Sequence, residues 1–213
     1  MSHDLIDQVL SITPGSHLDQ LRRHREVARE NIQKAYDALF APRDTNEVSL
    51  VERLAIASFV TGLHGQIVLA DHYAHLLSTS EGGVAVAALI NEEIERGTTE
   101  GPYGTYPAGP LASENKQGPL YAVAPANRTH LGLRLRVALE HAHLLVFRPR
   151  DASREALHGL INAGWSTAGV VTISQLVAYL AFQTRIVEGL STLAATDVTA
   201  PRLPKVAPAS AIA

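Results

Sequence analysis

No cysteine occurs among the 213 residues of the chain. Its absence excludes disulfides, thiolate nucleophiles, Cys-x-x-Cys redox pairs and every metal site that needs sulfur ligands. An excess of charge of one sign is also lacking, because 18 Lys and Arg oppose 21 Asp and Glu. The one basic run, over residues 22–25, is followed closely by glutamates. This balance gives no general attraction to phosphate backbones, so we expect no nucleic-acid partner.

Long uncharged runs are few, and the longest extends over residues 156–184. It is long enough to span a bilayer, but it contains His158, Asn162, Gln175 and Gln183. Such polar interruptions are typical of buried helices in a soluble protein, so we expect no membrane partner. The beginning of the chain, MSHDLIDQVL, lacks a basic stretch ahead of an apolar one, which argues against a secretory signal. We therefore expect a cytoplasmic protein.

Helical patterning is abundant, whereas strand patterning is scarce. Apolar side chains recur at steps of three and four through residues 16–40, which predicts an amphipathic helix. Ser49 and Glu52 form a capping box, and the apolar residues after it predict one buried helix over 49–77. Gly62 and Gly65 interrupt this run, where glycines usually permit close packing or a kink and the alternative is direct contact with a ligand. We expect an all-α fold.

Glycine and proline concentrate in residues 97–126, where five of each occur. No periodic element forms at that density, so we expect a long internal loop, either an ordered cover over a cavity or interface or a flexible linker. Helical patterning fills a first half over about 16–96 and a second half over about 127–195. We expect one domain over 1–197, followed by a Pro/Ala-rich tail over 198–213.

The two halves share a short motif that ends a helix. Residues 39–44 have the sequence LFAPRD, and residues 146–151 have the sequence VFRPRD. Each motif follows an amphipathic run and precedes a capped one. This similarity predicts a pseudo-repeated second half, and the alternative is that proline chemistry at helix ends produced both motifs.

Several common catalytic motifs are missing, among them the P-loop, G-x-G-x-x-G after a strand, H-E-x-x-H and G-x-S-x-G. Histidine is plentiful, with 10 residues. His64, His72 and His75 fall on one face of the predicted helix, and three imidazoles can hold zinc or iron. His64 stands ~12 Å along the helix axis from His72, so a shared metal needs further ligands, for which His141 and His143 are candidates. The alternative is that these histidines are buried, hydrogen-bonded or at an interface.

The predicted helix over 49–77 begins with a Ser-x-x-Glu-Arg sequence and continues with a characteristic apolar body. The residues that carry this pattern are Ser49, Glu52, Arg53, Val60, Leu63 and Gly65. The pattern resembles the core of the AhpD-like, carboxymuconolactone decarboxylase (CMD) superfamily. Residues 160–165 and 175–185 resemble the end of its peroxidase-related members. The resemblance implies an AhpD-like helical fold and assembly as a homo-oligomer.

The chemistry of the family's redox branch is absent from the corresponding positions. That branch uses a glutamate, two cysteines and a histidine as a thiol peroxidase site. The resemblance places Leu54, Gln66, Leu69 and Tyr73 at these four positions. Peroxide reduction of this kind needs a thiolate nucleophile and a resolving partner, which Gln and Leu cannot supply. Thiol peroxidase activity through this site is therefore excluded.

Polar side chains nevertheless remain at that place, namely His64, Gln66, His72 and Tyr73. Histidine can transfer protons near neutral pH, and a tyrosine and an amide can orient a substrate. The family's decarboxylase branch does not depend on a cysteine pair. The resemblance therefore suggests acid–base catalysis on a small organic substrate without a cofactor, with the 97–126 loop covering the pocket. The alternatives are a noncatalytic oligomeric scaffold or ligand-binding relative, and a His-ligated metal protein.

Overall fold

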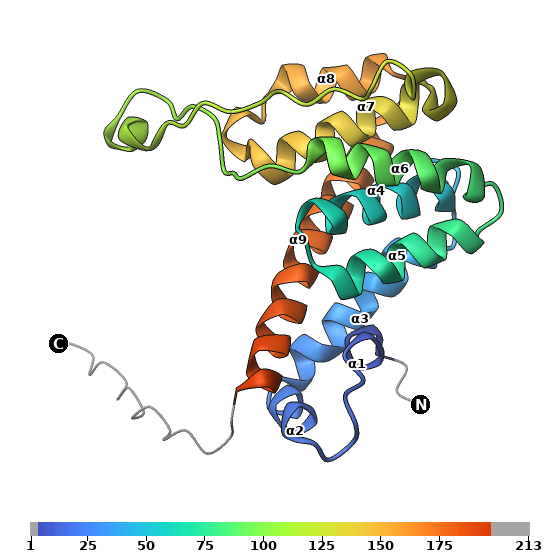
Figure 1. The fold of residues 1–213 in the computed structure, drawn as a ribbon, viewed down its shortest axis with the longest axis vertical. Helices are drawn as coiled ribbons and strands as arrows, with labels where there is room; N and C mark the ends of the chain where they lie inside the picture. Colours follow the sequence, from blue (N-terminus) through green and yellow to red (C-terminus); the bar gives the residue numbers. More distant parts are fainter. Residues whose placement is uncertain (1–3, 197–213) are drawn as a thin grey trace.

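The computed structural model describes residues 4–196, and its regular elements are helical (Figure 1). Nine α-helices and two short 3₁₀-helices form within these residues, besides one isolated β-bridge between Gly104 and Lys116. The helices are α1 (Leu5–Val9), α2 (His17–Arg23), α3 (Glu26–Phe40), α4 (Leu50–Leu63), α5 (Ile67–Thr79), α6 (Val84–Gly97), η1 (Pro110–Glu114), α7 (Arg128–Phe147), η2 (Pro149–Asp151), α8 (Arg154–Asn162) and α9 (Thr167–Ala195). The expected all-α class is confirmed, and the expected tail over 198–213 lies outside the described residues.

Helix α4 lies at the centre of the molecule. Its capping box forms as expected, because Ser49 Oγ accepts from the Glu52 amide and the Glu52 carboxylate accepts from the Ser49 amide. Residues 53–61 are all buried, since α5, α6, α7 and α9 pack around them. Arg53 is the charged residue of this run, and its guanidinium donates to the Leu39 carbonyl at 2.8 Å. The apolar body of the predicted helix is thus the core of the fold.

The helix expected over 49–77 is not continuous, and this expectation is wrong. Helix α4 ends at Leu63 with His64 as its C-cap, and Gly65 follows with φ of +67°, a left-handed conformation that costs glycine little. Gln66 then caps α5, its side-chain oxygen accepting hydrogen bonds from two amides of the first turn. This turn lets α5 fold back beside α4 (Figure 1).

The helix expected over residues 16–40 is also divided, into α2 and α3. The division brings two arginines to one pair of carboxylates. Arg22 is buried and forms ion pairs with Asp4, at 2.9 Å, and with Asp7. Arg29 of α3 forms ion pairs with the same two carboxylates. These long-range pairs hold α1 against α2 and α3.

Helix α9 is the longest helix and runs along the long axis of the molecule (Figure 1). A buried chain of hydrogen bonds joins it to α5 and α3. Tyr73 donates to Gln183 Oε1 at 2.7 Å, Gln183 donates to Tyr179 Oη at 3.3 Å, and Tyr179 donates to the Ile32 carbonyl at 3.3 Å. Within residues 4–196, α9 alone is long and apolar enough to cross a membrane, and 50% of its most apolar window is buried inside the molecule. The buried polar chain ties α9 to the core of the described structure.

The expected irregular loop over 97–126 is present, and buried anchors hold it. The carboxylate of Glu93 is fully buried and accepts hydrogen bonds from the Tyr121 hydroxyl and the Asn127 amide group, at 2.7 and 2.9 Å. The Tyr103 amide donates to the last turn of α7. Between these anchors the segment that contains η1 projects away from the helices (Figure 1).

The two short motifs that suggest a repeat both end a helix in the structure. Helix α3 ends at Phe40, and α7 ends at Phe147. Only the second motif continues into a 3₁₀-helix, η2. The AhpD-like fold and the pseudo-repeat therefore stay predictions.

We predict that Gly65→Val lowers the free energy of unfolding by about 1–2 kcal/mol, because a β-branched residue resists a positive φ. An added Cβ meets no atom within 4 Å at this position, so backbone strain is the cost. Gly65→Asn is the matched control and should cost much less, since asparagine tolerates the left-handed region. Urea denaturation measures both variants. Equal losses in the two variants would contradict the left-handed turn.

Candidate functional site

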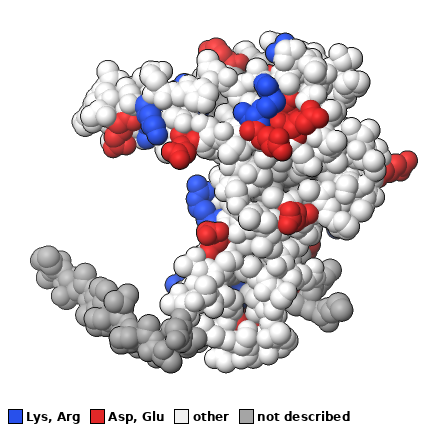
Figure 2. All heavy atoms as spheres, viewed as in Figure 1, with Lys and Arg blue, Asp and Glu red and all other residues white. Residues whose placement is uncertain are grey.

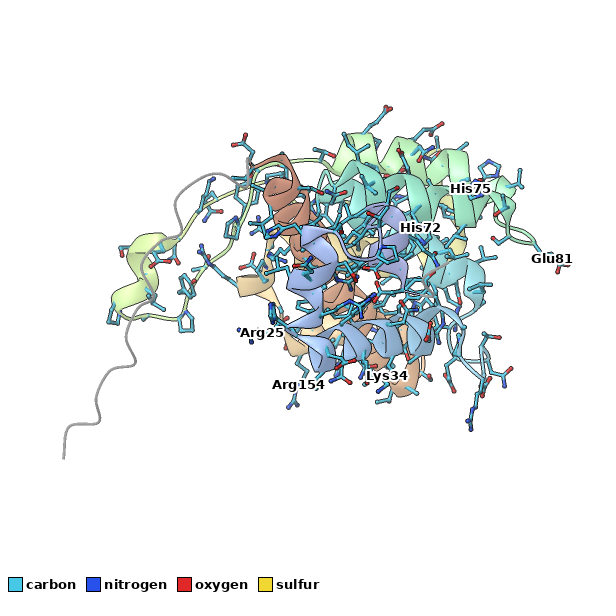
Figure 3. All side chains as sticks on the ribbon, turned by 90° about the horizontal axis from the view of Figure 1, so that it is seen from below. Arg25, Lys34, His72, His75, Glu81 and Arg154 are labelled. Carbon is cyan, nitrogen blue, oxygen red and sulfur yellow. The ribbon has the colours of Figure 1, made fainter. Side chains whose placement is uncertain are left out.

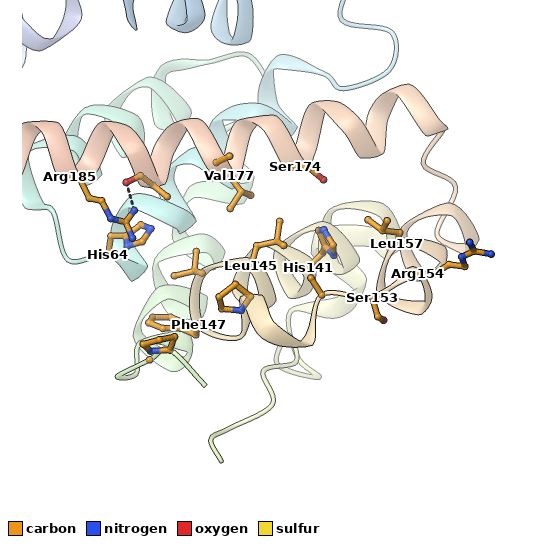
Figure 4. A pocket seen from close by; sticks show the side chains of 17 residues that line it. His64, His141, Leu145, Phe147, Ser153, Arg154, Leu157, Ser174, Val177 and Arg185 are labelled. Atoms are coloured by element: carbon orange, nitrogen blue, oxygen red, sulfur yellow. Dashed lines mark hydrogen bonds between the residues drawn. The ribbon is translucent and has the colours of Figure 1, made fainter. Parts of the chain in front are cut away.

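A cavity of about 950 Å³ lies between α7, α8 and the middle of α9 (Figure 4). His64 borders one end of it, and Gly101 and Pro102 bring the internal loop to its edge. Its apolar walls consist of Leu145, Phe147, Leu157, Val177, Ala178 and Ala181. The volume and the apolar walls are typical of pockets that bind small organic molecules.

The ring of His64 lies beside Arg185 at one end of this cavity (Figure 4). Its Nε2 is buried and has no hydrogen-bond partner within residues 4–196. Burial lowers the pKa of His64, and the positive charge of Arg185 lowers it further. The imidazole is therefore neutral at pH 7 and offers one donor and one acceptor nitrogen.

His141 on α7 borders the same cavity and is only 6% exposed. Neither of its ring nitrogens has a partner in the described part of the chain, and burial lowers its pKa. His143 on the same helix is buried too, but its Nε2 bonds to the Gly97 carbonyl at 2.8 Å and its ring stacks on Tyr121. Buried polar groups nearly always have partners, so the unpaired His141 beside a cavity is a candidate ligand-binding residue.

The cavity lining is positive. None of its 17 described residues is Asp or Glu, whereas Arg185 and Arg154 lie at opposite ends (Figure 4). Arg185 donates to the Ala181 carbonyl at 2.6 Å and forms no ion pair with a described carboxylate. A guanidinium that lacks an acidic partner beside apolar walls favours a carboxylate ligand.

Of the four residues that the sequence predicts as one site, only His64 lines the cavity, whereas the rings of His72 and Tyr73 contact each other with centroids 5.0 Å apart. Gln66 caps α5, and its amide group donates to Glu188 Oε2 at 3.0 Å. Tyr73 is fully buried and donates to Gln183, and burial raises its pKa well above the ordinary value of 10. Gln66 therefore stabilises the start of α5, and Tyr73 stabilises the buried core.

The turn at Gly65 also separates His64 from His72 and His75, the other two histidines considered as metal ligands. His72 is directed toward α3, with its Nε2 3.5 Å from Tyr36 Oη, and burial lowers its pKa. His75 is exposed at the outer edge of α5 (Figure 3). No group of three or more His, Asp or Glu within residues 4–196 could hold a metal ion. The break after His64 is the reason, because it directs α5 away from the axis of α4.

Two residues of the cavity were missed as ligand-binding groups by the sequence-based reasoning. His141 is considered there only as a metal ligand, and Arg185 only as part of a family resemblance. One feature of the sequence does indicate Arg185, because this residue ends the long uncharged run over 156–184. A cation that ends an apolar helix stretch is a candidate anchor for an acid with an apolar body.

Surface charge gives no alternative site on the face shown in Figure 2. Basic and acidic side chains occur there in small mixed groups, and most of the face is uncharged. The expected basic run over 22–25 does not form a continuous exposed face either, because Arg22 is buried. The absence of a nucleic-acid partner stays a prediction.

We predict that His141→Leu leaves the free energy of unfolding unchanged or raises it by up to about 1 kcal/mol, because it removes two buried nitrogens without partners. His143→Leu should lower it by about 1–2 kcal/mol, since the bond to Gly97 and the stack on Tyr121 are lost. Urea denaturation near pH 7.5 compares the two variants. If His141→Leu lowered the free energy of unfolding as much as His143→Leu does, this result would contradict the unpaired state of His141.

We also predict that the melting temperature falls between about pH 7.5 and 5.5. The pKa values of His64, His72, His141 and His143 are lowered from 6.5 in the folded chain. The unfolded chain therefore binds more protons as the pH falls through 6.5, and folding stability is lost. The fall in melting temperature should be smaller in His141→Leu than in the wild-type protein. An identical fall in the two proteins would contradict a lowered pKa of His141.

Comparison of the chain with protein-family models, with curated proteins and with solved structures finds no match. The family resemblance consequently depends on the motifs within residues 49–73, 160–165 and 175–185. The cavity depends instead on the contacts of this chain, with a neutral His64 beside Arg185 at one end.

Proposed function

We propose that the protein binds a small organic acid in the cavity, with the carboxylate at Arg185 and His64. The apolar body of the acid lies between α7, α8 and α9. The observation that carries this proposal is the absence of any acidic residue from the described lining, combined with an Arg185 that has no acidic partner. Arginine binds a carboxylate through two parallel hydrogen bonds, and the exposed Arg185 is accessible to such a ligand at the edge of the cavity.

The position of His64 supports acid–base chemistry on the bound acid. Its imidazole is neutral because burial and Arg185 lower its pKa, so one ring nitrogen can accept a proton. Proton transfer close to the carboxylate of the acid is the reaction that this arrangement favours. The decarboxylase branch of the family that the sequence resembles likewise works without cysteines. His72, originally the second candidate acid or base, does not line the cavity.

The AhpD-like fold, a homo-oligomeric assembly and a cytoplasmic location belong to the same proposal. Their support is the motif resemblance, the all-helical structure and the apolar side chains that α8 and α9 expose. These side chains are Ile161, Val171 and Phe182, which do not line the cavity. Exposed helical faces of this kind are suited to burial between symmetry-related copies.

A noncatalytic ligand-binding relative is the second candidate. It is favoured by the side chains of Gln66 and Tyr73. Gln66 caps α5 and Tyr73 is hydrogen-bonded in the core, so neither orients a substrate in the cavity. Both candidates bind the acid, and they differ in turnover. His64→Gln should abolish turnover in the enzyme, whereas the noncatalytic protein converts no acid in either form.

We predict that octanoate binds at least tenfold more tightly than octanamide, because the amide keeps the apolar body and loses the charge. Arg185→Gln should weaken octanoate binding at least tenfold, or about 1.4 kcal/mol. The exposed Arg25, which lies outside the cavity lining, provides the matched control Arg25→Gln and should have no effect. Isothermal titration calorimetry measures these affinities. Equal binding of acid and amide, or full affinity in Arg185→Gln, would refute the proposal.

A further inference from the structure

His141 and Arg185 mark two separate places in the cavity. Figure 4 shows His141 beneath the stretch of α9 between Ser174 and Val177, whereas Arg185 lies beside His64 at one end. Val177 and Arg185 are eight positions apart (185 − 177), which corresponds to about 12 Å along a helix axis. One carboxylate cannot contact both residues.

His141 is suited to bind an uncharged polar group. A neutral imidazole offers one donor and one acceptor, and neither has a partner in the described chain. A rotation about the Cβ–Cγ bond of His141 turns a ring nitrogen toward a molecule in the cavity that the ring borders. Arg154, the charged side chain of the lining on this side of the cavity, lies beyond Leu157 in Figure 4, so it does not offset the burial of a charged group at His141.

The lining between the two places is apolar. It is formed by Leu145, Val177, Ala178 and Ala181, none of which has a polar side chain. A hydrocarbon chain or ring is the ligand part that this stretch stabilises by removing apolar surface from water. The cavity therefore has a charged end, an apolar middle and an uncharged hydrogen-bonding position.

We propose that the ligand is an organic acid with a second, uncharged hydrogen-bonding group, a hydroxyl or a carbonyl oxygen, and that His141 binds this second group. An apolar segment separates the two groups by about 12 Å, the spacing between Val177 and Arg185 along α9. The inference rests on the proposed function, which places the carboxylate at Arg185. It adds the chemical class of the acid and the residue that selects it.

The test uses hexanoate, octanoate and decanoate together with their ω-hydroxy counterparts. In the wild-type protein the hydroxyl should raise affinity about fivefold at the chain length that reaches His141, which corresponds to ~1 kcal/mol. It should raise affinity less at the other lengths. In His141→Leu and in His141→Phe the ratio of the two affinities should fall to about one. His130→Leu changes an exposed histidine of α7 outside the cavity lining and should keep the preference.

The outcomes separate the two proposals. Absence of a hydroxyl preference at every chain length overturns the inference about His141, and so does a preference that survives in both apolar variants. If these acids bind and Arg185→Gln weakens their binding, the proposal that Arg185 binds the carboxylate still stands, even when the inference about His141 fails. If no acid of the series binds, or Arg185→Gln has no effect, the proposed function fails and the inference fails with it. Thermal melting of each variant confirms that it is folded during the titration.

Discussion

The left-handed turn at Gly65 is the constraint on which both the core and the cavity depend. It ends α4 so that His64 borders the cavity, and it restarts the chain at Gln66 so that α5 packs back on α4. The reversed helix then buries Tyr73, whose hydroxyl reaches Gln183 of α9. In an unbroken helix over residues 49–77, the polar side chains would share one face. Neither the packing of α5 on α4 nor the position of His64 at the cavity would then form.

Hydrogen bonding distinguishes the core from the cavity. In the core, Tyr73 and Gln183 are paired with each other, and the fully buried Glu93 accepts from several donors of the internal loop. At the cavity, His64 has one unpaired ring nitrogen and His141 has two. Within residues 4–196, three of the four buried side-chain nitrogens without a partner belong to His64 and His141, and the fourth is Arg136 Nε. The proposed organic acid would supply partners for the two imidazoles.

Local chemistry made much of the fold predictable. The Ser49 cap, the dense glycine and proline of residues 97–126 and the apolar periodicity follow short-range rules. The turn at Gly65 was not predictable, because a glycine in an apolar run is equally compatible with close packing. His64 was identified as a site residue, whereas His141 and Arg185 were not identified as ligand-binding groups. The end of the uncharged run marks Arg185, but the proposed pairing of its role with that of His141 depends on the packing of α7 against α9, which no spacing along the sequence encodes.

The central claim is that His64 contacts a bound organic acid and that the other predicted site histidine does not. The most direct measurement is nitrogen NMR of the histidine rings in protein labelled with ¹⁵N-histidine, recorded before and after saturation with octanoate. We expect the NMR signals of the His64 ring nitrogens to shift, while those of His72, which points toward Tyr36 outside the cavity, stay unchanged. Unchanged His64 signals at saturation, or a shift confined to His72, would contradict it.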